Sequence, residues 1–128
     1  MLGAIIGDTV GSRFEWHNHR SKDFDFLTYK CEPTDDSIMT LAIAKAILKS
    51  EGKVNKLPDL AVRYMQQLGR LYPDAGYGGA FREWIRSNNP KPYNSFGNGA
   101  AMRVSPAGFA ARSMNEAKAM SKAVIKVT

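Results

Sequence analysis

The chain has 128 residues, of which 44% are hydrophobic, so it is long enough for one compact domain, and no apolar run approaches the roughly 18 residues of a membrane span. Its net charge of +6, from 18 basic and 12 acidic residues, suits an anionic partner, but the basic residues are dispersed and no basic stripe alternates with aromatic residues, which argues against nucleic acid. The single cysteine, Cys31, excludes an intramolecular disulfide, and together with a start that does not resemble a secretion signal it leads us to expect a cytoplasmic protein with no membrane partner.

The first predicted element is a helix over residues 2–14. Gly3, Gly7 and Gly11 fall on one stripe of this helix, and glycine lets another backbone approach closely because it has no Cβ atom. A glycine inside a helix costs about 1 kcal/mol relative to alanine. Three of them at intervals of four residues therefore predict a buried helix that crosses another one tightly.

The same helix carries two acidic residues. Asp8 and Glu15 are seven positions apart, nearly two whole turns, so a continuous helix places both carboxyl groups on one face, with Ser12 close by. Two carboxyl groups on one helix face could act together in a functional site. They are also consistent with solvated or ion-paired side chains, the commoner state of acidic residues on a helix.

Residues 16–33 predict a loop that ends at Pro33, because the residue before a proline is biased away from helix. A strong helix follows, with Thr34 as its N-cap and an apolar face that continues to Leu48.

The start of this second helix reads Pro33-Thr34-Asp35-Asp36-Ser37. Asp35 and Asp36 suit the positive end of the helix dipole. A threonine hydroxyl beside two carboxylates also offers three oxygen atoms to a hard divalent cation. The segment is thus compatible with a metal site and equally with an ordinary helix start.

Three shorter helices are expected at about 57–70, 79–88 and 115–127, joined by loops at 73–79 and 87–99. The segment Arg103-Val104-Ser105-Pro106 could be a modification site, but it is more typical of the end of a buried helix. No alternation with a period of two residues indicates a strand, so the predicted fold class is all-α.

Two glycine-rich loops, AGYGG at 75–79 and SFGNGAAMR at 95–103, are candidate ligand-binding segments. Backbone N–H groups in such loops can cradle a pyrophosphate, and an adjacent aromatic side chain can cover a base or a ribose. Neither loop is a P-loop, because no Gly-Lys-Ser/Thr follows, and neither is a dinucleotide fingerprint, because no strand precedes it. Plain turns are the alternative interpretation.

Taken together and in this order, four segments resemble the ADP-ribosylglycohydrolase family, which includes dinitrogenase-reductase-activating glycohydrolase and the ADP-ribosyl-acceptor hydrolases. The segments are GAIIGDTVGSRFE, PTDDSIMT, AGYGGAFREWI and SFGNGAAMRVSPAG. The resemblance extends over the whole chain and implies a compact multi-helix fold.

The resemblance also implies a site with two magnesium or manganese ions, for which Thr34, Asp35 and Asp36 are the metal ligands. Glu15 and Asp36 are the implied catalytic residues, with Glu15 as an acid/base, a water-positioning residue or a gate for the metal. Ser37 stands where the family more usually has threonine and keeps a hydroxyl group. The implied substrate-binding residues are Tyr77, Gly78, Gly79, Ser95, Phe96, Gly97, Asn98 and Gly99.

One departure from the family concerns the remaining metal ligands, which relatives take from a later Asp-x-Asp-Thr motif that these residues lack. We therefore expect residues 1–128 to be the amino-terminal part of a truncated domain, with an incomplete metal site. Apolar surface that a missing part would cover predicts self-association.

The implied activity is hydrolysis of the glycosidic bond between ADP-ribose and an acceptor, in an ADP-ribosylated protein or small molecule. The sequence leaves the acceptor open. It also leaves two alternatives: a fragment that binds ADP-ribose or a nucleotide without catalysis, and a helical interaction fragment with no ligand.

Overall fold

The computed structural model describes all 128 residues, which form helices joined by loops, with no strand. In chain order the elements are α1 (Leu2–Gly11), η1 (Ser12–Phe14), α2 (Asp35–Ser50), η2 (Val54–Lys56), α3 (Leu57–Leu71), α4 (Gly79–Arg86), α5 (Gly99–Met102), α6 (Ser105–Ala110) and α7 (Met114–Ile125), where η denotes a short 3₁₀ turn. The all-α prediction is confirmed. None of the helices combines the length and the apolar character that crossing a membrane requires.

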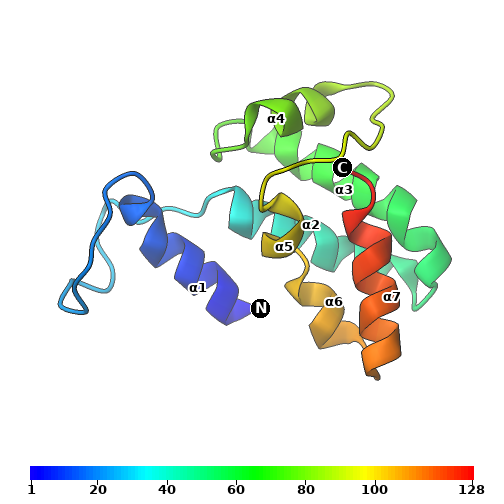
Figure 1. Cartoon of the computed structure of the whole chain (residues 1–128), viewed down its shortest axis with the longest axis horizontal. Helices are drawn as coiled ribbons and strands as arrows, with labels where there is room; N and C mark the ends of the chain where they lie inside the picture. Colours follow the sequence, from blue (N-terminus) through cyan, green and yellow to red (C-terminus); the bar gives the residue numbers. More distant parts are fainter.

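Helix α2 is the centre of the core. Met39, Ala42, Ile43 and Ala46 on this helix are completely buried, and α2 packs against α3, α6, α1 and α5 (Figure 1). Its start follows the predicted capping pattern, since the Thr34 hydroxyl accepts a hydrogen bond of 3.3 Å from the backbone N–H of Asp36.

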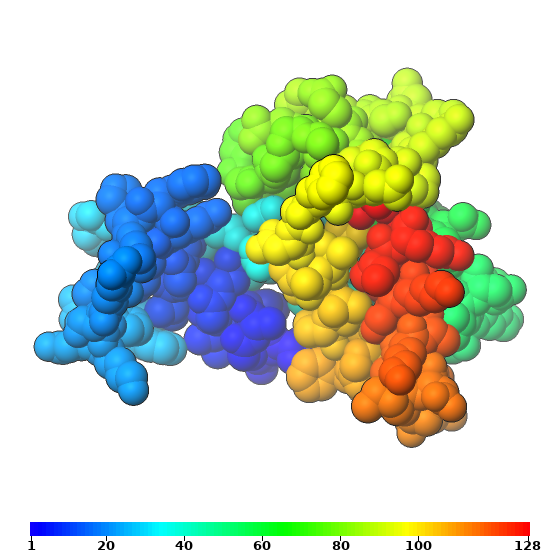
Figure 2. Space-filling view, viewed as in Figure 1, coloured from blue at the N-terminus to red at the C-terminus, as the bar shows by residue number.

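Helix α1 does not match the predicted buried, tightly packed helix. It ends at Gly11 and buries only Val10, and a Cβ atom added at Gly3 or Gly7 would meet nothing within 4 Å. Figure 2 shows α1, in dark blue, between the lighter blue loop at the left edge and the rest of the molecule. The prediction was wrong because the glycine stripe faces open space, and the helix contacts the body mainly through a polar side chain described below.

The segment at 99–110 also differs from the prediction. Arg103 separates the two short helices α5 and α6, so Ser105 begins a helix where the sequence suggested an end. Pro106 lies in the first turn of α6, where a missing N–H costs nothing because that group has no helical partner. The helices predicted at 57–70, 79–88 and 115–127 are present with small shifts at their ends.

Close helix packing occurs instead between α3 and α4, at Gly69. A Cβ atom at this position would lie 2.7 Å from Cδ1 of Ile85 and 3.0 Å from its Cγ1 and Cγ2. Ile85 is buried and therefore has little room to move away. The glycine on α3 thus allows α4 to approach.

We predict that Gly69→Ala destabilises the chain by about 1 to 2 kcal/mol, because overpacking against Ile85 exceeds the gain of about 1 kcal/mol in helix propensity. Urea denaturation measures this change, and adding Ile85→Val, which removes Cδ1, should recover part of the loss.

Gly7→Ala is the matched control, since it makes the same exchange in a helix without steric conflict. It should leave stability unchanged or raise it by up to about 1 kcal/mol. A destabilising effect at Gly7 with none at Gly69 would contradict the packing described here.

Candidate functional site

The carboxylate of Asp8 connects α1 to the start of α2. It accepts hydrogen bonds from the backbone N–H groups of Thr34 (2.9 Å) and Ser37 (3.2 Å). It also accepts one from each of their hydroxyl groups, both at 2.5 Å. Four donors on one carboxylate fix both its orientation and that of the first turn of α2, because charge-assisted hydrogen bonds are short and strong.

The first glycine loop contacts the same helix start. The backbone N–H of Asp35 donates to the carbonyl oxygen of Ala75 at 2.6 Å. Gly76 has φ of +95°, a backbone conformation that favours glycine, and a Cβ atom there would lie 3.6 Å from Oδ1 of Asp35. The loop therefore passes directly beside the Asp35 carboxyl group.

The two aspartates of α2 lie in an acidic environment. Burial, followed by repulsion from Asp36, Glu15 and Asp8, raises the pKa of Asp35 to about 6. Burial and repulsion from Asp8 and Glu15 also raise the pKa of Asp36 above its ordinary value. Burial, together with repulsion among the acidic side chains, thus outweighs the stabilisation that a helix N-terminus offers to an anion.

A cavity of about 380 Å³ joins this acidic region to both glycine loops. Figure 2 shows the second loop, in yellow, crossing the face of the molecule below α4. The lining residues are Asp35, Gly78, Gly79, Ala80, Phe81, Tyr93, Asn94, Ser95, Phe96, Gly97, Asn98, Gly99, Met102 and Arg103. The cavity therefore unites segments that are up to 68 positions apart in the sequence, from Asp35 to Arg103.

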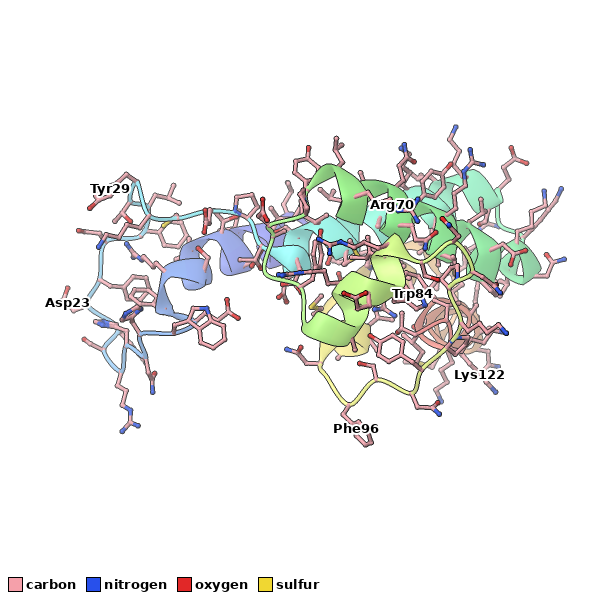
Figure 3. All side chains as sticks on the ribbon, turned by 90° about the horizontal axis from the view of Figure 1, so that it is seen from above. Asp23, Tyr29, Arg70, Trp84, Phe96 and Lys122 are labelled. Atoms are coloured by element: carbon pink, nitrogen blue, oxygen red, sulfur yellow. The ribbon has the colours of Figure 1, made fainter.

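Most of the predicted substrate-binding residues line this cavity, but two of them have unexpected positions. Tyr77 is buried in the core, with its ring 5.8 Å from that of Phe81, and does not line the cavity. Phe96 lines the cavity with a fully exposed side chain, and Figure 3 shows it projecting from the edge of its loop.

The predicted metal and catalytic residues are close together but only Asp35 lines the cavity. Glu15 is exposed beyond η1, and its charge acts on both Asp35 and Asp36. The predicted alignment of Asp8 with Glu15 on one continuous helix is wrong, since α1 ends at Gly11. Both acids nevertheless converge on the start of α2.

Sequence reasoning missed two features of this region. It singled out Asp8 as an acid but not as the hydrogen-bond acceptor for the helix start, a role that only the fold reveals. It also included Arg103 at the end of the second glycine-rich segment without giving its side chain a part in ligand binding, and in the structure this side chain is almost completely buried and lines the cavity. The available signal for a part in ligand binding was its position directly after the glycines of the second loop.

The donor chemistry at the start of α2 fits a hard cation, because carboxylate and hydroxyl oxygens are present and the carboxylates repel one another. The Thr34 hydroxyl gives its hydrogen to Asp8 and one lone pair to Asp36, which leaves a second lone pair. The number of donors is small. No group of three or more His, Cys, Asp or Glu side chains is arranged to hold a metal ion.

Comparison with known proteins identifies one family. A family model described as ADP-ribosylglycohydrolase matches residues 1–128. ADP-ribosylhydrolase ARH3 of Xenopus tropicalis is 32% identical over 133 residues, covering 81% of this chain and 36% of that protein. ADP-ribosylhydrolase ARH3 of Mus musculus and of Homo sapiens are each 28% identical, covering 100% of this chain and 42% and 43% of those proteins. The chain thus spans about two fifths of the length of these curated relatives. No solved structure matches.

We predict that Asp35→Asn stabilises the chain at pH 7 by on the order of 1 kcal/mol, after allowance for solvent screening at a half-buried carboxyl. Folding raises the pKa of Asp35 from 3.8 to about 6. The protonated side chain of Asp35 therefore makes its full contribution to the stability of the folded chain below pH 3.8. This contribution is lost as the pH rises through about 6 and the carboxyl group ionises. Denaturation between pH 4 and 7 should show a shallower decline in the variant.

Asp59→Asn is the matched control, since Asp59 is an exposed acid in the first turn of α3. This variant should lose about 0.3 to 1 kcal/mol of folding stability, because it removes a favourable interaction with the helix dipole. The sign of this effect is opposite to that expected for Asp35→Asn. Equal losses for both variants at pH 7 would contradict the repulsion at Asp35.

Proposed function

The chain belongs to the ADP-ribosylglycohydrolase family, and we propose that it acts in the hydrolysis of the glycosidic bond between ADP-ribose and an acceptor. The observation that carries this proposal is the cavity in which Asp35 meets both glycine loops. Its volume of about 380 Å³ lies within the range of small-molecule sites.

The glycine loops are suited to the diphosphate part of the substrate. Gly78 and Gly79 stand at the start of α4, and Gly97 and Gly99 belong to the opposite loop. Backbone N–H groups at such positions bind phosphate oxygens. Tyr93 and Phe96 at the same cavity offer aromatic surface to a base or a ribose.

The acidic residues are suited to the glycosidic bond. Positive charge develops on the ribose as this bond breaks, and the carboxylates of Asp35, Asp36 and Glu15 stabilise it. We assign Glu15 the role of orienting or deprotonating the attacking water.

Thr34, Asp35 and Asp36 would hold a magnesium or manganese ion in this proposal, one of the two that the family uses. When bound, the cation supplies a positive charge that polarises water and binds ribose hydroxyl groups. Its charge would also relieve the repulsion that, after burial, contributes to the raised pKa values of Asp35 and Asp36. Three oxygen ligands supply at most about half of the coordination that such an ion needs, so binding to this chain is weak.

A second candidate function is binding of ADP-ribose without catalysis. Two observations favour this function. Both glycine loops line one cavity, and the acidic side chains at the start of α2 do not form a full set of metal ligands. The substrate is in either case an ADP-ribosylated protein or small molecule, or ADP-ribose itself.

We predict that the chain binds ADP-ribose about tenfold more tightly with magnesium than with a chelator. Calorimetry measures this difference, which corresponds to about 1.4 kcal/mol of binding free energy. Asp35→Ala combined with Asp36→Ala should remove the magnesium-dependent part. Hydrolysis of ADP-ribosyl-serine and ADP-ribosyl-arginine peptides should be far slower than for a full-length relative, because an incomplete metal site stabilises little charge.

Asp74→Asn, an exchange at an exposed acid of the loop before α4, is the control and should leave binding unchanged. Absence of ADP-ribose binding would contradict the proposed function. Binding that is indifferent to magnesium would leave the non-catalytic function and contradict the metal assignment. Rapid hydrolysis that Asp36→Ala abolishes would show that the residues present suffice for catalysis.

A further inference from the structure

Arg103 is a charged side chain in a buried position. Only 2% of its surface is exposed, which is rare for arginine unless a partner neutralises its charge. Burial lowers its pKa to about 10, with nearby Tyr93 acting in the opposite direction, so the guanidinium remains cationic at neutral pH. A buried positive charge requires a compensating interaction.

The chain supplies little of that compensation. The guanidinium carries five N–H donors, and the hydrogen bond it makes is from Nη2 to the hydroxyl of Thr128 at 2.8 Å. Its Nε is buried without a partner. The ring of Phe81 lies 5.8 Å from Cζ, near the outer limit of a cation–π contact.

The guanidinium lies against the second glycine loop. A Cβ atom added at Gly99 would be 3.7 Å from Nη1 of Arg103, and both residues line the cavity. Asp35, whose environment is acidic, lines the same cavity. The cavity is therefore bipolar, with an acidic region at Asp35 and a separate cationic one at Arg103.

We propose that Arg103 is an anion-binding residue of this cavity, whose unpaired N–H groups bind the pyrophosphate of the ligand beside Gly99. The proposal rests on the proposed function for the identity of the ligand as a nucleoside diphosphate sugar. A pyrophosphate is the group that supplies two adjacent negative charges to the planar N–H donors of arginine. The acidic region then faces the ribose at the other end of the same ligand.

Dissociation constants for inorganic pyrophosphate and for ADP-ribose, measured by calorimetry in a chelator, test this role independently of any metal. Arg103→Met should weaken binding of both roughly 10- to 100-fold, since a hydrogen bond to a charged group contributes about 1.5 to 3 kcal/mol. Its melting temperature without ligand should be equal to or higher than that of the wild type, because an unpaired buried charge is removed.

Arg70→Met is the matched control. The Arg70 side chain donates to the backbone carbonyls of Ile85 and Ser87 and lies outside the cavity. Its loss should lower the melting temperature and leave both dissociation constants within twofold of the wild type. The opposite signs of the two effects on stability separate a binding arginine from a structural one.

A measurement on the unaltered chain keeps the test decisive if Arg103→Met does not fold. The NMR resonance of the Arg103 Nε–H should shift when inorganic pyrophosphate saturates the wild-type chain, and an unshifted resonance would overturn the proposal. ADP-ribose binding that Arg103→Met leaves unchanged would also overturn it while the proposed function stands. Pyrophosphate binding through Arg103 without ADP-ribose binding would uphold the anion site and contradict the proposed function. Binding of neither would overturn both.

Discussion

The arrangement of the candidate site depends on the carboxylate of Asp8. Four hydrogen bonds from Thr34 and Ser37 end on this one side chain, and they join a largely exposed helix to the start of α2. Each contributes on the order of 1 kcal/mol or more, because the acceptor is charged. Without them α1 would be held mainly by Val10, the one residue that it buries. The interaction has a cost, since Asp8 adds to the negative charge around Asp35 and Asp36.

That cost is the reason to regard the start of α2 as functional. A helix start built for stability alone would avoid several repelling carboxyl groups, and this one gathers them beside a cavity. The same cavity contains an arginine that the chain leaves largely unpaired. Both features are unfavourable in the empty protein and favourable around a ligand with a diphosphate at one end and a developing positive charge at the other. In the proposed function, the two regions would be complementary parts of a single binding site.

The sequence allowed some of these features to be predicted. The cap at Thr34 and the acidic first turn are local signals, and α2 begins where they indicate. The glycine loops were recognisable by their composition. In the structure, both of them line one cavity. The burial of α1 was wrong because glycine spacing permits close packing without requiring it, and the contact is made by Asp8 instead. The burial of Tyr77 was not predicted, because an aromatic ring beside a glycine loop is as suited to the core as to a ligand. Arg103 contacts Thr128 and Phe81, which are distant in the sequence, so the residues next to it do not indicate its burial.

The central claim is that Asp8 orders the first turn of α2, from which Asp35 reaches the cavity between the glycine loops. Paramagnetic broadening of backbone amide resonances by manganese, compared between the wild type and Asp8→Asn, tests it most directly. In the wild type, Gly76 and Gly78 should broaden at lower manganese concentrations than Gly52, which lies beyond the far end of the 16-residue helix α2, roughly 24 Å away. Asp8→Asn should weaken this selective broadening while the spectrum remains that of a folded protein. Selective broadening of the same size in both proteins, or broadening of Gly52 first, would contradict the claim.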